Sequence, residues 1–312
     1  TGSDDKSTRI WNLTNGQLIT TLIGHEAGVS SAAFSYDASR IVTGSKDCTI
    51  RLWDAKDGKC VEVLPKQAAR VDRLVFSPRN KRLASKCEYK EAVHIWNDQC
   101  KVESIINVHQ NGQGVRTIQF SNDESKVLTA SDDGTAKICD ASSGKLLVDF
   151  KGHQYGVPTA EFSPDNRFVV TAGFDQIGCT WDAKTGKAIH ILKGHTELLV
   201  CAEYNSDGTK IVTASKDNSA IIWEAATGKI LKRLAGHTDD VHHATFSPNG
   251  LYVVTCSSDK IAKIWNAITG QLVINLTGHT SMVYEAMFTP DGKKLVTRSF
   301  EKYVHVWNLN DV

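Results

Sequence analysis

The sequence lacks the features that would place it in several large classes of protein. Its 36 basic and 35 acidic side chains leave a net charge of +1, so global charge gives no reason to expect nucleic acid or an anionic membrane as the main partner. No apolar run approaches the ~18 residues of a membrane span. No signal peptide is visible, although the chain starts at Thr1 rather than Met, so an upstream segment is expected to be missing. With 41% apolar and 23% charged residues, the composition is that of an ordinary soluble globular protein.

The sequence also lacks any C-x-x-C pair, although it holds eight cysteines. They are Cys48, Cys60, Cys87, Cys100, Cys139, Cys179, Cys201 and Cys256. Several occupy strand positions where the repeats described below carry small or apolar residues. This pattern indicates buried free thiols in a reducing compartment rather than a disulfide or zinc framework. We therefore expect a cytoplasmic protein, with the nucleus as an alternative, and no metal or cofactor.

Helical periodicity is absent as well, and a long repeat takes its place. The clearest copy begins at Gly236-His237, continues through Val241 to Phe246, and ends at Ile264-Trp265. The copies end 42 or 43 residues apart along the whole chain. Intact copies span 24–53, 152–181, 194–223, 236–265 and 278–307, worn copies span 66–96 and 109–139, and a partial copy spans 1–11.

Each copy carries four short strand signals separated by turn signals. The first strand runs from an aliphatic residue to an aromatic residue five positions on, as in Val241 and Phe246. A small or aliphatic residue two positions before the aromatic one, such as Ala244, gives the period-2 alternation of a β-strand. Polar turns and glycine turns separate the later strands. The sequence predicts an all-β protein.

A fixed period of this size, with Gly-His near the start and Trp-Asp or Trp-Asn at the end, resembles the WD-repeat (WD-40 type) β-propeller family. The resemblance covers essentially residues 1–312 and implies a closed seven-bladed propeller of four-stranded antiparallel blades in a single domain. The seven first strands give the count of blades. Residues 12–22 read as a fourth strand without a first, so we expect this N-terminal strand to complete the last blade after Trp307 and to remove its open edge. The partial repeat 1–11 then lies outside the ring or belongs to a longer array.

Five repeats share a polar set at fixed spacing: a histidine, a threonine 18 residues later, an acid 4 after that, and a tryptophan 6 after that. The sets are His25-Thr43-Asp47-Trp53, His153-Thr171-Asp175-Trp181, His195-Thr213-Asp217-Trp223, His237-Thr255-Asp259-Trp265 and His279-Thr297-Glu301-Trp307. The donors and acceptors suit a linear chain from indole to hydroxyl to imidazole to carboxylate. A hydrolase triad uses similar residue types but occurs once per domain. We interpret the sets as structural tetrads and expect no catalytic residues and no enzyme activity.

The second and third repeats depart from this pattern. The second has Lys66-Gln67 in place of Gly-His and Tyr89 in place of the acid. The third has Cys139 in place of tryptophan, and its histidine is displaced to His109 or replaced by Asn111. We expect these blades to have lost their polar networks and to be the most mobile part of the ring.

The resemblance also implies a binding rim, formed by residues just before the tetrad acid and around the start of each first strand. Transferred to this chain, these positions include an apolar set from three repeats, a charged set from the second and third repeats, and one histidine. They are Phe174, Leu198, Val200, Met282, Tyr284 and Phe300; Arg70, Asp72 and Arg116; and His242. An exposed apolar cluster beside a charged one has the composition of a binding patch. The alternative is that some of these side chains plug the channel mouth or pack between blades.

The second repeat is locally basic, with one acid, Asp72, among seven basic residues. These are Lys66, Arg70, Arg73, Arg79, Lys81, Arg82 and Lys86. The stretch is either a solvated face or a site for an acidic or phosphorylated partner. The pair His242-His243 shows no ligand partners nearby in the sequence, so we interpret it as no metal site.

We therefore predict a non-catalytic protein–protein interaction scaffold that binds a partner peptide or domain on its rim, as a monomeric propeller or as a module of a larger protein. Membrane partners are not expected, and nucleic acid is not favoured. One alternative is a reader of acidic, phosphorylated or nucleic-acid ligands through the basic second repeat. A less favoured alternative is an enzyme with a site at the channel mouth.

Overall fold

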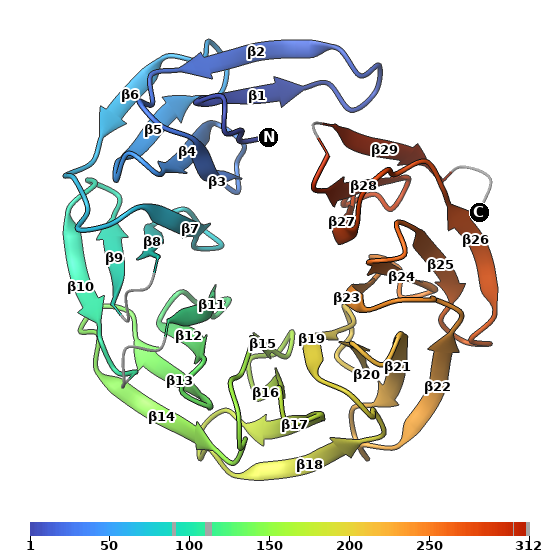
Figure 1. Ribbon diagram of the computed structural model, residues 1–312. Helices are drawn as coiled ribbons and strands as arrows, with labels where there is room; N and C mark the ends of the chain where they lie inside the picture. The colour runs from blue at the N-terminus through green and yellow to red at the C-terminus, as the bar shows by residue number, and fades with distance from the viewer. Residues whose placement is uncertain (89–91, 110–113, 302, 310–312) are drawn as a thin grey trace. The chain divides into compact units, whose positions relative to one another are not determined.

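The computed structural model describes residues 1–88, 92–109, 114–301 and 303–309, and these residues form 29 β-strands (Figure 1). The strands pair antiparallel within short sheets. No helix in the described part of the chain is long and apolar enough to cross a membrane. The prediction of an all-β protein is confirmed.

Local sequence explains the sheets. On the third strand of the fifth repeat, Ala220 to Trp223 are all buried, since this strand packs on both of its faces. The fourth strand of the same repeat follows a turn in which the Gly228 amide donates to the Glu224 carbonyl at 2.8 Å. Gly228 has a φ of 68°, a conformation that a side chain disfavours. The glycine turns of the sequence therefore mark where each third strand reverses into the fourth.

The chain divides into two compact units, and each is described by itself. Residues 1–129 and 137–147 form unit 1, and residues 130–136 and 148–312 form unit 2. The division passes through one sheet, formed by β11 (Val115–Phe120), β12 (Lys126–Ser131), β13 (Thr135–Asp140) and β14 (Leu146–Lys151).

Unit 1 also holds a hairpin and two complete blades. The hairpin consists of β1 (Ser7–Trp11) and β2 (Leu18–Ile23). The first blade consists of β3 (Val29–Phe34), β4 (Arg40–Ser45), β5 (Ile50–Asp54) and β6 (Cys60–Val63). The second consists of β7 (Val71–Phe76), β8 (Arg82–Cys87), β9 (Val93–Asn97) and β10 (Val102–Ile106).

Unit 2 holds three complete blades and a three-stranded sheet. The blades are β15 (Thr159–Phe162), β16 (Phe168–Ala172), β17 (Ile177–Asp182) and β18 (Ala188–Lys193); β19 (Leu199–Tyr204), β20 (Lys210–Ser215), β21 (Ser219–Glu224) and β22 (Ile230–Ala235); and β23 (Val241–Phe246), β24 (Tyr252–Ser257), β25 (Ala262–Asn266) and β26 (Leu272–Leu276). The three-stranded sheet is β27 (Val283–Phe288), β28 (Lys294–Ser299) and β29 (Val304–Asn308).

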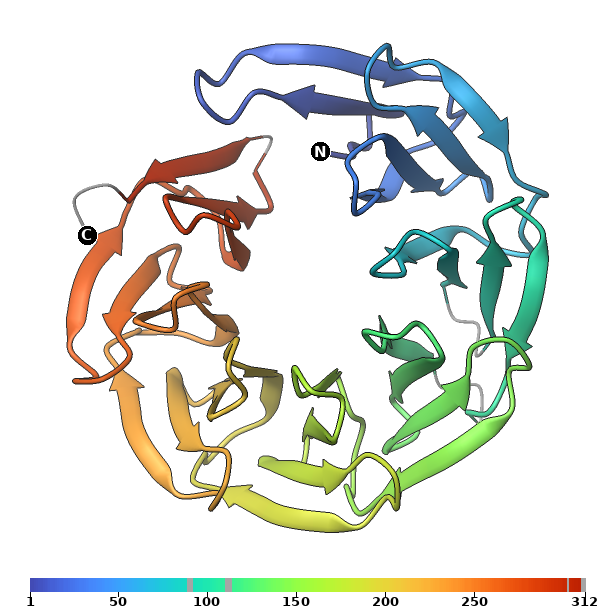
Figure 2. The same ribbon diagram turned by 180° about the vertical axis from the view of Figure 1, so that it is seen from behind.

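The first strands of successive blades lie side by side in unit 2, on the inner side of its arc, with the fourth strands outside (Figure 2). Apolar side chains fill the space between neighbouring blades, as Cys201, Val212 and Ile222 do against Val241 and Phe246. Polar side chains join the inner strands directly, because backbone amides of one first strand donate to side chains of the preceding one. The Tyr204 amide donates to Glu161 at 2.8 Å, and the Ala202 amide donates to Thr159 at 3.1 Å.

Seven sheets open with the aliphatic-to-aromatic first strand that the sequence predicts, and six of them have four antiparallel strands in the described residues. The prediction of a seven-bladed propeller of four-stranded blades is confirmed. Each of the seven ranges from 24–53 to 278–307 covers the first two strands of one blade and all but the last residue of the third.

In the structure β2 pairs with β1, from Ser7 opposite Ile23 to Trp11 opposite Leu18. This pairing is local, because β1 is the third strand of the partial repeat and offers β2 the same neighbour that β5 offers β6. The sheet of β27, β28 and β29 has three strands in the described part of the chain. That residues 12–22 complete the last blade stays a prediction, since this segment and the last sheet belong to different units.

The hairpin also packs against the first blade. Ile10 and Leu22 form one buried cluster with Ile41 and Trp53, and the Val29 amide donates to the Ser3 carbonyl at 2.9 Å. The partial repeat 1–11 is therefore an integral part of unit 1.

Candidate functional site

Four of the five predicted tetrads are present as complete hydrogen-bonded chains, and the last one has its indole and imidazole links to Thr297. In the fifth repeat, Trp223 Nε1 donates to Thr213 Oγ1 at 2.8 Å, His195 Nε2 lies 2.8 Å from the same oxygen, and His195 Nδ1 lies 2.7 Å from Asp217. The three repeats that begin at His25, His153 and His237 have the same arrangement, with distances of 2.7–2.9 Å for the shortest contact at each link. Each acid also accepts a backbone amide next to its histidine, as Asp217 does from Thr196 at 3.1 Å. The tetrads thus hold the loop before each first strand against the blade.

Burial and hydrogen bonding set the protonation of these groups. Burial alone raises the pKa of Asp217, but hydrogen bonds from His195 and Ser219 outweigh it and hold the pKa well below its usual value. Burial lowers the pKa of His237 despite the hydrogen bond to Asp259. Neutral imidazole between a hydroxyl and an ionised carboxylate is the state that the geometry favours.

The prediction that the second and third repeats have lost their polar networks is wrong, because other residues replace the missing ones. In the second repeat, Trp96 Nε1 donates to Ser85 Oγ at 2.7 Å, and His94 Nδ1 lies 3.0 Å from Gln67 Oε1. In the third, His109 Nε2 lies 2.8 Å from Thr129 Oγ1, so His109 is the displaced tetrad histidine. Tyr89 and Asn111 lie outside the described residues.

The predicted apolar rim residues gather in two places in unit 2. Phe174 and Leu198 line a shallow hollow of about 390 Å³ together with Tyr155, Gly156 and Asp132. A Cβ at Gly156 would lie 3.0 Å from the Asp132 carboxylate and 3.2 Å from the Phe174 ring, so a side chain there would press on both. Tyr155, a residue that the sequence analysis missed, is exposed at the edge of this hollow; it follows the tetrad histidine His153 by two positions, and only the fold brings it to Phe174.

The second place is the last blade. The rings of Tyr284 and Phe300 lie with their centroids 5.0 Å apart, and the Arg298 guanidinium lies over the Tyr284 ring at 5.4 Å. Arg298 also pairs with Glu285 at 2.7 Å. Phe300 is 72% exposed and Met282 is 37% exposed. The Tyr284 and Phe300 side chains are called the aromatic pair below.

The other predicted rim residues are partly used within the fold. Val200 packs against the apolar core between two blades, as the alternative interpretation expected. His242 Nε2 lies 2.6 Å from Ser258 Oγ and is half-buried. In unit 1, Arg70 pairs with Glu88 and Asp72 pairs with Lys86. Arg116 is exposed.

The basic stretch of the second repeat is partly neutralised. Arg82 makes a two-pronged contact with Glu103, at 2.8 and 2.7 Å, and also donates to the Glu124 carbonyl and Ser142. The hydrogen bond to the Glu103 carboxylate raises the pKa of the Arg82 guanidinium. With Arg70 and Lys86 paired as well, three of the seven basic side chains already have acidic partners. These three ion pairs reduce the positive charge that the stretch offers to a partner.

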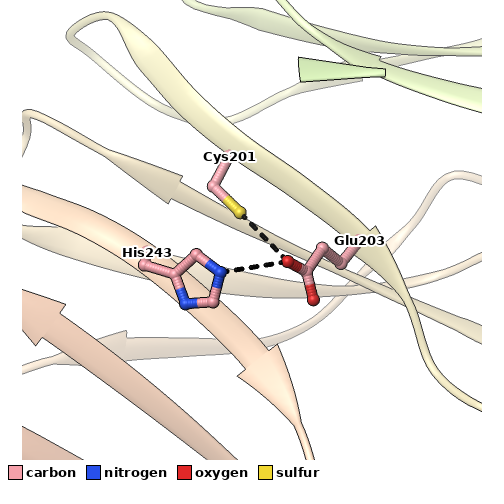
Figure 3. A group of neighbouring side chains, drawn as sticks. All are labelled: Cys201, Glu203 and His243. Atoms are coloured by element: carbon pink, nitrogen blue, oxygen red, sulfur yellow. Dashed lines mark hydrogen bonds and ion pairs between the residues drawn. The ribbon is translucent and has the colours of Figure 1, made fainter. Parts of the chain in front are cut away.

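A cluster that sequence reasoning missed lies between two inner strands of unit 2. Cys201 and Glu203 on β19 face His243 on β23, and the three side chains point toward one another (Figure 3). Glu203 Oε1 lies 3.1 Å from His243 Nε2 and 3.8 Å from Cys201 Sγ. Burial raises the pKa of the Cys201 thiol to about 12. Burial lowers the pKa of His243, but Cys201 and Glu203 outweigh it and hold this pKa well above its usual value.

Glu161 adds a second buried carboxyl beside this cluster. Burial and the nearby Glu203 carboxylate raise the pKa of Glu161 well above its usual value, while its Oε2 accepts the Tyr204 amide. The repeat period itself was the available signal, since Glu161 and Glu203 are one period apart, as are Cys201 and His243.

A second group of possible ligands occurs in the last tetrad. His279 Nδ1 and His305 Nε2 each lie 3.4 Å from Glu301, and the two imidazole rings have centroids 4.0 Å apart. Glu301 also accepts the backbone amides of Thr280 and Ser281. The longer acid of this tetrad thus still holds its loop.

Comparison with known families agrees with this geometry. The family model described as "WD domain, G-beta repeat" (WD40) matches residues 16–54, 100–140, 144–182, 186–224, 228–266 and 270–308. The chain belongs to the WD40 family. Residues 55–99, which hold the repeat with Gln67 and Ser85 in place of tetrad residues, are outside the matched ranges.

One solved structure similar to this WD40 protein is the crystal structure of the computationally designed Ika8 protein. The two chains are 26% identical, with a TM-score of 0.87, over 99% of this chain and 92% of that chain. No curated protein matches this chain.

Proposed function

We propose that this WD40 protein is a non-catalytic scaffold that binds a segment of a protein partner on the rim of unit 2. WD40 propellers are in general protein-interaction scaffolds, and membership of the family supports the coarse assignment. The finer assignment, binding on the rim of unit 2, rests on the aromatic pair. The Phe300 ring lies beside the Tyr284 ring, and Phe300 is 72% exposed.

The aromatic pair suits an apolar side chain of a partner. Aromatic rings offer a large contact area and lose little conformational entropy on binding, so a few of them carry most of an interface's energy. Arg298 over the Tyr284 ring reduces the freedom of that ring before any partner arrives. Glu285 and Arg298 offer a carboxylate and a guanidinium for polar contacts with the same partner segment. The hollow of Tyr155, Phe174 and Leu198 offers a second apolar contact in the same unit.

The histidines, acids and cysteines of this chain are residue types that enzymes use in catalysis, but their surroundings support a non-catalytic function. The tetrads are repeated from blade to blade, and imidazoles such as those of His195 and His237 are already bonded on both sides. The Cys201 thiol, with its pKa raised to about 12, is held as a neutral thiol and not as the thiolate that attacks substrates. An enzyme with its site at the channel mouth remains the less favoured alternative.

Peptide selection tests the proposal without a known partner. A displayed library of random peptides is selected on the wild-type protein, and the affinities of the enriched peptides are measured for Tyr284→Ala and Phe300→Ala. Each substitution is expected to weaken binding by ~1–3 kcal/mol while leaving the melting temperature unchanged. Tyr36→Ala, which removes an aromatic ring that is 81% exposed in unit 1, is the control. Enriched peptides that bind all four proteins equally would contradict a site at the aromatic pair.

We also propose a cytoplasmic or nuclear location, which the eight free cysteines support. A fluorescent fusion in cells tests it, and export of the protein to an oxidising compartment would overturn it.

A further inference from the structure

We propose that Cys201, Glu203 and His243 form a binding site for a transition-metal dication, with Zn²⁺ as the ion that fits the donors best. Thiolate sulfur, imidazole nitrogen and carboxylate oxygen are the three protein ligand types of zinc. The softer thiolate and the imidazole disfavour Mg²⁺ and Ca²⁺, which take oxygen ligands.

The distances fit one central ion. A tetrahedral zinc with ligand bonds of ~2.0 Å to nitrogen and oxygen and ~2.3 Å to sulfur separates its ligand atoms by roughly 3.3–3.5 Å. The measured separations are 3.1 Å between His243 Nε2 and Glu203 Oε1 and 3.8 Å between Cys201 Sγ and Glu203 Oε1. All three ligand atoms lie within 4.8 Å of one another. Small rotations of the side chains are enough to surround an ion.

Strand geometry brings these side chains together. Cys201 and Glu203 are two residues apart on β19, so they project from the same face of the strand. The bulges at Leu199 to Cys201 and at Val241 to His243 recur at the same position of β3, β7 and β27, so they are a feature of the blades in general. The inner strands of two neighbouring blades thereby bring their ligands together.

The site also has the environment of a metal centre. The imidazole turns Nε2 toward Glu203, and Glu161 lies beside the three ligands as a second carboxyl group. Glu203 and His243 keep 27% and 19% of their side chains exposed, which leaves a route for the ion.

Binding would release the Cys201 proton, which the thiol now donates toward the Ala244 carbonyl, and any second proton on His243. The three protein ligands leave one tetrahedral position for water. Because the ligands come from β19 and β23, the ion would join two blades and stabilise the folded protein by mass action.

Metal titration tests the site. Chelator-treated full-length protein is titrated with Zn²⁺ in a melting assay and with Co²⁺ under an absorption spectrometer. We expect one bound ion per chain, a melting temperature that rises with Zn²⁺, and a thiolate-to-cobalt charge-transfer band. Cys201→Ser should abolish the band and weaken binding by more than ~100-fold, because loss of second-shell groups alone costs 10–100-fold. Glu203→Gln and His243→Gln should weaken binding comparably.

Matched controls separate ligand loss from general damage. Cys179→Ser removes another buried thiol, and His190→Gln removes an imidazole that bonds the Ala226 carbonyl; both should bind like the wild type. Glu203→Gln preserves the shape of the side chain, so this variant remains informative if Cys201→Ser fails to fold. Absence of a stoichiometric ion, or a charge-transfer band that survives in Cys201→Ser, would overturn the proposal. Binding that His305→Gln abolishes and Cys201→Ser preserves would place the ion in the His279 group and overturn it as well.

Discussion

At the scale of single residues, each tetrad shows how a few polar side chains hold a loop that apolar packing does not reach. In the tetrad of His195 the indole, hydroxyl, imidazole and carboxylate are each satisfied by the next. Removing one member therefore leaves its neighbour with an unmet hydrogen bond.

Asp217→Ala tests this role. The substitution takes the acceptor from His195 Nδ1 and from the Thr196 amide, and it is expected to lower the free energy of unfolding by ~1–3 kcal/mol. Chemical denaturation measures the loss, and the peptides selected on the wild type should bind the surviving folded variant with unchanged affinity. A variant of full stability that loses a measurable turnover would show that the tetrads are catalytic.

The tetrad histidines also predict the direction of a pH effect. Burial holds the pKa of His237 below its unfolded value, so its contribution to stability is present above the unfolded pKa of ~6.5 and is lost as the pH falls. The stability difference between the wild type and His237→Gln should narrow when the pH is lowered from 7.5 toward 5. Urea denaturation at several pH values measures it, and a difference that widens on acidification would contradict the assignment of a neutral histidine.

At the scale of elements, the N-terminal hairpin has a role that the sequence analysis did not assign. Strand β2 pairs with its neighbour β1, and Ile10 and Leu22 pack on the first blade. If residues 12–22 only closed the ring, deletion of residues 1–10 would be harmless. In the structure this deletion removes the buried Ile10 side chain and most of β1, the partner of β2.

Ile10→Ala tests the packing of this hairpin. Ile10 is 9% exposed, and truncating a buried isoleucine costs ~2–5 kcal/mol, so the melting temperature should fall by several degrees. Ile19→Ala on the same hairpin, where the side chain is 58% exposed, is the matched control and should change stability little. Equal effects of the two substitutions would show that the hairpin does not pack on the first blade.

At the scale of the whole molecule, charge and apolar surface suggest different partners, and ionic strength separates them. Exposed ion pairs are screened by salt, whereas apolar contacts are not. If the aromatic pair of unit 2 is the main contact, the affinity of the selected peptides should change less than about threefold between 50 and 500 mM salt. Titrations by fluorescence anisotropy measure this.

A steep loss of affinity with salt, together with a large effect of Arg79→Ala or Lys81→Ala, would instead favour the basic second repeat as the binding surface. The pairing of Arg70, Arg82 and Lys86 with acidic residues argues against that outcome, since these side chains have already lost much of their attraction for an external anion.

Much of this protein follows from its sequence. The repeat period with Trp-Asp ends fixes blade number and strand order, because each repeat is one sheet that cannot bury its faces alone. The tetrads were predictable to the residue, since the donor inventory allows one linear chain of hydrogen bonds at that spacing. Worn repeats were harder. Gln67 and Ser85 replace tetrad members with other residue types, and only proximity in the fold identifies them.

Tertiary structure alone decided which residues from different blades meet. Cys201 and His243 are one repeat period of 42 residues apart, but the period alone does not say which side chains of neighbouring blades touch. The packing of β19 beside β23 places both near Glu203. The exposure of Phe300 and the burial of Val200 were equally undetermined, because rim and core share the same apolar residue types. Periodicity specifies the contacts within a blade, whereas contacts between blades depend on how neighbouring sheets pack.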